Sequence, residues 1–184
     1  MMPLVQVTQS HAGVKWLDGG RQGAAALGFC KSGVLDVMSA WLAHALVGHH
    51  IAATEYRPEL FYQIPACVEI TAGNCEFTLL TALRFAHCGA QGPLFLNDKA
   101  IPTGCAVDGK AGDVIRVGFY RHGCRGYLAF GADMATEPHA RSYGSCIALT
   151  PDGKTPSLLQ GHYLTGRPTP SQTRPYSLAH NIQA

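Results

Sequence analysis

Residues 18–36 read DGGRQGAAALGFCKSGVLD and lead directly into an apolar segment. The stretch shows neither the two-residue alternation of a strand nor the longer period of a helix. Its glycines permit positive φ angles and close approach of the backbone, and its few polar groups are arginine, lysine, serine and aspartate side chains. These features are typical of a surface linker or of a binding loop.

The segment that follows this stretch predicts one principal α-helix. Leu35, Met38, Leu42 and Ala45 to Leu46 recur at helical spacing. Asp36 is suited to cap the start of the helix or to interact favourably with its dipole, and Gly48 is suited to end it.

Most of the remaining chain is expected to form short strands, because apolar segments alternate with turn signals. The expected strands are 5–8, 53–56, 60–64, 66–71, 75–80, 83–86, 92–96, 114–119, 126–130 and 145–149. Many short strands with one helix predict a mainly β fold that closes into a barrel over residues 1–165. The change in composition at Gly166 predicts a Pro-rich extended tail or truncated linker over 166–184.

The composition excludes several classes of protein. With 47% hydrophobic and 14% charged residues the chain is not a disordered one, and a formal net charge of +2 without a basic cluster argues against nucleic acid. No apolar run approaches the roughly 20 residues of a membrane span. Seven cysteines without a C-x-x-C pair, and a start without a signal peptide, lead us to expect reduced thiols in a cytoplasmic protein.

Two common motifs do not fit the sequence. Residues 104–111, GCAVDGKA, nearly match a phosphate-binding loop, but Ala111 replaces the hydroxyl residue and a strand follows instead of a helix. A tight turn between strands is therefore predicted there. The histidines are scattered and no H-E-x-x-H occurs, so we expect no metal site.

The chemistry of the opening stretch allows two interpretations. In the first, Arg21 offers a planar fork to a carboxylate or phosphate, and Ser32 and nearby amides face the same anion. Asp18 and Asp36 would then orient Arg21 or handle protons. In the second, Ser32 or Asp36 caps the helix, Asp18 is a turn residue and Arg21 is solvated.

The ordered motifs of the chain resemble those of a known family. Residues 18–36 and AHALVGH at 43–49 match, in register, the pattern Q-D-x-G-R-x-G, G-x-P-x-S-G-x-[LM]-D and A-N-A-L-V-G-N. The further matches are TEY at 54–56, ITAGN at 70–74, LNDKAIP at 96–102, KAGDVIRVG at 110–118, GCRGYLAFGADM at 123–134 and ARS at 140–142. This set resembles the allophanate hydrolase subunit 2 family, which includes the C subunit of 5-oxoprolinase and the biotin-dependent carboxyltransferase domain of urea carboxylase.

The chain also departs from the family pattern. Leu17 stands where the family has glutamine, Cys30 where it has proline, and Asn74 where it has aspartate. Family chains continue into a second related half, so we expect either a fragment or a shortened homologue.

The resemblance implies a cyclophilin-like β-barrel and a place in an ATP-dependent 5-oxoprolinase complex, with partners similar to the A and B subunits of that enzyme. ATP would act through the complex, on a small amide or lactam substrate. Arg21 would clamp an anion, with Asp18 and Asp36 orienting it or moving protons. The other residues expected to bind substrate are Gly20, Ser32, Gly33, Asn74, Arg141 and Ser142.

Two alternatives remain open under the same resemblance. One is a biotin-dependent carboxyltransferase domain similar to that of urea carboxylase. The other is a shortened, non-catalytic binding or regulatory partner of a protein similar to the B subunit.

Overall fold

The computed structural model describes residues 2–11, 13–20, 26, 28, 33–49, 64–134 and 163–168. The described part contains one α-helix, α1 (Val37–Leu46), and otherwise strands and turns. The strands are β1 (Met2–Gln9), β2 (Val14–Leu17), β3 (Cys67–Thr71), β4 (Cys75–Leu79), β5 (Leu83–Gln91), β6 (Leu94–Leu96), β7 (Lys99–Ile101), β8 (Ala106–Gly109), β9 (Val114–Val117), β10 (His122–Phe130), β11 (Ala132–Met134) and β12 (Tyr163–Pro168).

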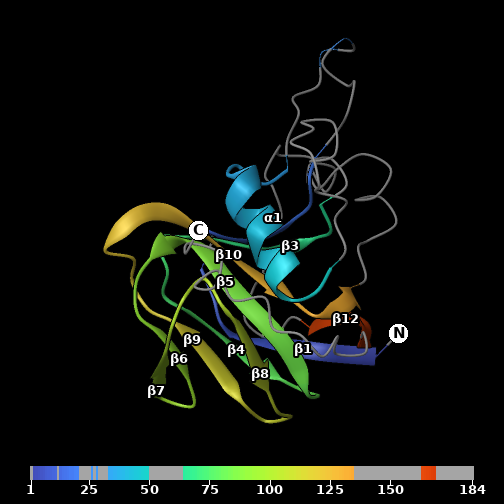
Figure 1. Cartoon of the computed structure of the whole chain (residues 1–184), viewed down its shortest axis with the longest axis vertical. Coiled ribbons are helices and arrows are strands. Elements are labelled where there is room, and N and C mark those ends of the chain that lie inside the picture. The colour runs from blue at the N-terminus through green and yellow to red at the C-terminus, as the bar shows by residue number, and fades with distance from the viewer. Residues whose placement is uncertain are drawn as a thin grey trace, which may run out of the picture.

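These strands form two antiparallel sheets that pack face to face (Figure 1). The seven-stranded sheet has the order β11-β12-β1-β4-β9-β6-β7, and the five-stranded sheet has the order β2-β3-β10-β5-β8. Apolar side chains from both sheets, including Phe77, Phe85 and Phe130, form the core between them. The mainly β fold with one principal helix is therefore confirmed.

The five-stranded sheet is buried on both faces. Along β10, Leu128 and Phe130 join the core between the sheets, whereas Tyr127 and Ala129 join a second core under α1. This arrangement follows from strand geometry, since successive side chains point to opposite faces. The outer face of this sheet therefore carries the helix and the loop that precedes it.

Helix α1 begins as the sequence predicts, but only part of the predicted apolar set forms its buried face. Asp36 is its N-cap, with Oδ1 accepting a hydrogen bond from Ser39 N, and Gly48 follows the last turn with φ 92°. The buried face consists of Ala40, Ala43, His44 and Leu46. Leu35 and Met38, which defined the periodicity, are 71% and 49% exposed. Small alanines allow the helix to approach the sheet closely, and Leu46 packs there with them, with Trp41 and Leu42 partly buried against the same core.

Several predicted strands are confirmed and others differ in length. Strands β1, β3, β4, β6 and β9 overlap their predicted ranges, and β5 and β10 are longer than predicted. The strands that the sequence did not predict are β2, β7, β8, β11 and β12. Strand β12 pairs with β1 and spans residues 165 and 166, between which the sequence predicted the boundary of the barrel domain and the tail. The predicted strands 53–56 and 145–149 lie outside the described residues, as does all of 60–64 except Ile64.

The turn between β3 and β4 has an unusual backbone. Ala72, Gly73 and Asn74 all have positive φ, at 64°, 86° and 63°. A Cβ on Gly73 would overlap the carbonyl oxygen of Gly118, so only glycine fits this contact. The turn is held by hydrogen bonds from Ala72 N to the carbonyl of Cys124 and from Tyr120 N to the carbonyl of Ala72.

Two histidines are buried in the described part of the chain. His87 is 1% exposed, and its Nε2 lies 2.9 Å from the hydroxyl of Tyr120. Burial lowers the pKa of His87 to about 4. His44 on α1 is also 1% exposed, and burial followed by the nearby His49 lowers its pKa to about 3. Both imidazoles are therefore neutral in the folded protein near neutral pH.

We expect Gly73→Ala to destabilise the fold by about 3 kcal/mol, because it combines an unfavourable φ with a backbone overlap. Gly112→Ala is the matched control, since Gly112 has φ 89° but nothing within 4 Å of an added Cβ. That change should cost only roughly 1–2 kcal/mol. Urea unfolding measures both, and equal losses would contradict the described packing of this turn.

We expect the free energy of unfolding to fall as pH decreases from about 6.5 to about 4. In this range the unfolded histidines bind protons while folded His87, with a pKa of about 4, does not, so stability rises with pH. The loss from His87 should reach about 3 kcal/mol. Urea unfolding at several pH values should show a shallower dependence in His87→Gln, and no change in slope in the exposed control His122→Gln. Identical slopes in all three proteins would contradict the burial of His87.

Candidate functional site

The candidate site is built around a carboxylate buried on the outer face of the five-stranded sheet. Glu69, in the middle of β3, is 2% exposed. In register, Lys15 of β2 lies opposite Glu69 on one side and Tyr127 of β10 on the other. These three residues form one row across the sheet, beside the loop that precedes α1.

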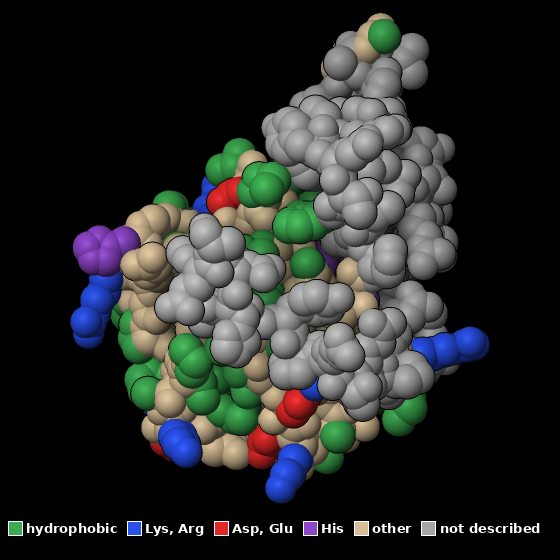
Figure 2. Space-filling view, in the orientation of Figure 1, with side chains coloured by type: hydrophobic (Ala, Val, Ile, Leu, Met, Phe, Trp, Pro, Cys, Tyr) green, Lys and Arg blue, Asp and Glu red, His purple; other side chains and the backbone are tan. Residues whose placement is uncertain are grey.

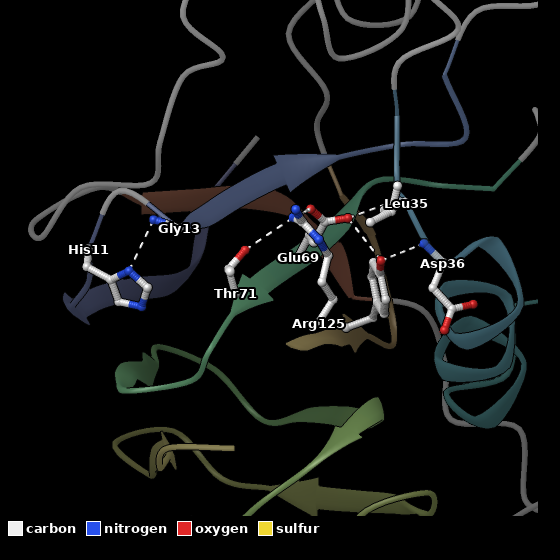
Figure 3. A network of polar contacts seen from close by, with 8 residues as sticks. His11, Gly13, Leu35, Asp36, Glu69, Thr71 and Arg125 are labelled. Atoms are coloured by element: carbon white, nitrogen blue, oxygen red, sulfur yellow. Dashed lines mark hydrogen bonds and ion pairs between the residues drawn. The ribbon is translucent and has the colours of Figure 1, made fainter. Parts of the chain in front are cut away.

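One oxygen of Glu69 holds this loop. Oε2 accepts hydrogen bonds from the backbone N of Leu35 at 2.9 Å and from the hydroxyl of Tyr127 at 3.0 Å (Figure 3). The same Tyr127 oxygen accepts a hydrogen bond from Asp36 N at 2.7 Å. Burial raises the pKa of Tyr127, which keeps its hydroxyl protonated and able to donate to Glu69.

The other oxygen of Glu69 holds a cation. Arg125 Nη1 donates to Oε1 at 2.6 Å and also to the hydroxyl of Thr71 at 3.2 Å. The Arg125 side chain is 32% exposed, so the ion pair has a buried anion and a partly solvated cation. The guanidinium and the amide of Leu35 are thus bound to the two oxygens of one carboxylate (Figure 3).

The structure describes both ends of the stretch 18–36, and these ends, residues 18–20 and 33–36, are hydrogen-bonded to each other. Asp18 Oδ1 accepts a hydrogen bond from Gly20 N at 2.8 Å, and the Asp18 carbonyl accepts one from Val34 N at 2.9 Å. Gly33 has φ 82°, and a Cβ there would lie 2.5 Å from Gly20 N. Gly20 and Gly33 are therefore in close backbone contact, and only glycine fits at position 33.

The structure brings together Asp18, Gly20, Gly33 and Asp36 from the residues expected at the site. The carboxylate of Asp36 binds Ser39 N and Ser39 Oγ, which are the contacts of an N-cap. Asn74 lies in the β3–β4 turn, where its Oδ1 accepts a hydrogen bond from Gln9. The other expected residues, Arg21, Ser32, Arg141 and Ser142, lie outside the described residues.

No role was predicted from the sequence for Glu69, Tyr127 or Arg125. A signal was present for Glu69, since CVEIT places a carboxylate between apolar residues in a predicted strand. Such a position requires hydrogen-bond partners if it is buried. Arg125 and Tyr127 lie in a segment already matched to the family, and their alternation places them on one face of β10.

The geometry also limits what the backbone amides can do. The amides of Leu35 and Asp36 are bound by Glu69 and Tyr127, and that of Ser39 is bound by Asp36. These N–H groups are therefore not donors for a substrate anion. The guanidinium of Arg125, which is bound to Glu69 and partly exposed, is a charged donor at the described site.

Comparison with known proteins identifies the family. The model of the carboxyltransferase domain, subdomain A and B, matches residues 27–180. The chain belongs to this carboxyltransferase domain family. It is 33% identical over 129 residues to the C subunit of 5-oxoprolinase from Escherichia coli (strain K12), covering 70% of this chain and 37% of that protein. It is also 32% identical over 110 residues to urea amidolyase of Lachancea kluyveri, covering 60% of this chain and 5% of that protein.

Solved structures of similar proteins share the fold of this family member. A crystal structure of TTHA0988 has a TM-score of 0.76 and 26% identity, covering 95% of this chain and 32% of that one. The K. lactis urea amidolyase has a TM-score of 0.74 at 24% identity, covering 96% of this chain and 11% of that one, which shows the fold alone. The chain thus spans well under half the length of these relatives.

Metal-ligand clusters and a phosphate-binding loop are both absent from the described residues. No group of three His, Cys, Asp or Glu side chains capable of holding a metal ion occurs among them. Residues 104–111 contribute β8, which the sequence did not predict, and the turn into β9, and so do not form a phosphate loop. The described cysteines, which are Cys67, Cys75, Cys88, Cys105 and Cys124, are free thiols. Within the same residues, no helix has the length and apolarity needed to cross a membrane.

We expect Tyr127→Phe and Glu69→Gln to be energetically coupled, because the two side chains share one hydrogen bond and hold neighbouring amides. Each change should cost about 1–3 kcal/mol, and the coupling in a double-mutant cycle should be about 1–2 kcal/mol. The control pair is Tyr127→Phe with Asp108→Asn, since Asp108 pairs with Arg84 on other strands. Urea unfolding of all variants gives the coupling energies. Additivity in the first pair as well as in the control would contradict the described network.

Proposed function

We propose that this carboxyltransferase-family chain is a component of an ATP-dependent 5-oxoprolinase complex, in the position of the C subunit. Its role would be to hold a small amide or lactam, or the anionic intermediate formed from it, beside the loop that precedes α1. The observation that carries this proposal is the similarity to the C subunit of 5-oxoprolinase. The ion pair of Glu69 and Arg125 at that loop supports it, because it provides a fixed cation next to the stretch that resembles the family's binding motif.

Under the proposed function, ATP use and substrate binding belong to different proteins of the complex. As the family resemblance implies, ATP is assigned to the partners that resemble the A and B subunits. Arg21 is the proposed anion clamp, and Asp18 and Asp36 would orient the clamp or move protons. The carbonyl oxygen of an amide gains negative charge when it is attacked or phosphorylated, and a guanidinium at that oxygen stabilises the charge.

The outer surface of α1 supports the proposed contact with another protein of the complex. The helix contains no Lys, Arg, Asp or Glu, its Met38 is exposed, and so is Leu35 just before it. Hydrophobic side chains are visible together over this part of the molecule (Figure 2). A helix that is apolar on most sides is usually covered in the working protein.

The second candidate is a biotin-dependent carboxyltransferase, which the similarity to urea amidolyase favours. In that reaction a carboxyl group would pass from carboxybiotin, presented by another domain, to urea. The two candidates differ in substrate charge, since 5-oxoproline carries a carboxylate and urea does not.

The proposal predicts ATP-dependent conversion of 5-oxoproline to glutamate when the chain is combined with proteins similar to the A and B subunits. Arg21→Ala should lower turnover by about 100-fold or more, as expected for loss of a charge-stabilising donor. The control is Arg167→Ala, an exposed arginine on β12, which should leave turnover unchanged. Product glutamate and released phosphate are measured together.

Two results would count against the proposal in different ways. Full activity of Arg21→Ala would show that Arg21 is not the anion clamp. Absence of 5-oxoproline cleavage, together with carboxylation of urea by carboxybiotin, would establish the second candidate in its place.

A further inference from the structure

Arg125 differs from two other arginines of the sheets in what its guanidinium binds. Arg84 uses Nε and Nη2 together to bind both carboxylate oxygens of Asp108, at 2.8 and 2.9 Å. Arg116 directs the same edge to carboxylates, with Nη2 2.6 Å from Asp98 Oδ1 and Nε 3.8 Å from Glu76 Oε1. Arg125 instead uses Nη1 for Glu69 and Thr71, and its Nε and Nη2 have no partner among the described residues.

The edge of the Arg125 guanidinium formed by Nε and Nη2 is held in a fixed orientation. Nη1 is bound by two acceptors on β3, one of them the buried carboxylate of Glu69. Such contacts restrict the rotation of the guanidinium and reduce the entropy lost when a ligand binds. The Nε–H and Nη2–H groups of arginine are parallel and match the two oxygens of a carboxylate.

The position of this edge connects it with the proposed substrate. Arg125 lies opposite Thr71 in the register of β10 and β3, on the same sheet face as Glu69 and Lys15. Glu69 links the guanidinium directly to the amide of Leu35 in the loop before α1 (Figure 3). A carboxylate bound at Arg125 would therefore place the rest of a small ligand beside that loop.

We propose that Nε and Nη2 of Arg125 bind the carboxylate of the substrate, which makes Arg125 the residue that distinguishes a carboxylate-bearing lactam from a neutral amide. This inference rests on the proposed function and adds to it the residue that recognises the carboxylate. L-5-oxoproline has this chemistry, with a carboxylate on the carbon next to the ring nitrogen. Urea and other neutral amides lack the group that Arg125 would recognise.

The test compares two ligands that differ only in the carboxylate. The full 184-residue chain is titrated with L-5-oxoproline and with 2-pyrrolidinone, the same lactam without the carboxylate, and binding is followed by calorimetry and by NMR. We expect L-5-oxoproline to bind more tightly, and Arg125→Gln to weaken it by about tenfold or more while binding of 2-pyrrolidinone stays unchanged. Arg116→Gln is the matched control, because it removes another carboxylate-paired arginine on β9, and it should have no effect on either ligand.

Arg125→Lys provides a second variant if Arg125→Gln fails to fold. Lysine keeps the positive charge beside Glu69 but lacks the parallel donors, so L-5-oxoproline should bind more weakly than to the unchanged protein. Thermal unfolding monitored by circular dichroism confirms that each variant used is folded.

Three outcomes would overturn the inference. These are equal binding of the two lactams by the unchanged protein, no binding of L-5-oxoproline, and full affinity in a folded Arg125 variant. Failure of the proposed function is distinguishable, since it would show as Arg125-dependent carboxylate binding without ATP-dependent cleavage in the reconstituted complex.

Discussion

A single buried carboxylate, that of Glu69, determines how the loop before α1 lies on the sheet. A carboxylate that is 2% exposed is costly unless hydrogen bonds or an opposite charge compensate for its lost hydration. Three donors do so here: the amide of Leu35, the hydroxyl of Tyr127 and the guanidinium of Arg125. Because these donors come from a loop and from β10, satisfying one charge also fixes the relative positions of two separate segments.

This constraint changes which groups are available for function. Three amides at the start of α1, those of Leu35, Asp36 and Ser39, lie where an anion would be favoured and are bound by Glu69, Tyr127 and Asp36. The positive charge of the site is instead provided by Arg125, which is held on one side and partly exposed on the other. A rigid network under a partly solvated cation is an arrangement suited to recognition, since its orientation is set before a ligand arrives.

Local patterns in the sequence predicted much of the fold. Apolar segments between turn signals predicted β4, where Cys75, Phe77 and Leu79 are buried, and the Asp36 cap and Gly48 stop predicted the ends of α1. Periodicity predicted the packing side of α1 only in part, because Leu46 is buried but small Ala40 and Ala43 also pack against the sheet while Leu35 and Met38 are exposed. The Glu69 network was missed since it joins residues more than 50 positions apart, a separation that only the strand register resolves.

Amide hydrogen exchange of Glu69→Gln tests most directly whether Glu69 fixes the loop before α1. If it does, the amides of Leu35 and Asp36 exchange about tenfold faster or more in the variant, because their acceptors are weakened or displaced. The amides of Val68 and Ile70, in the same strand as Glu69, keep their protection. Unchanged exchange at Leu35 and Asp36 in a folded Glu69→Gln protein would contradict the account.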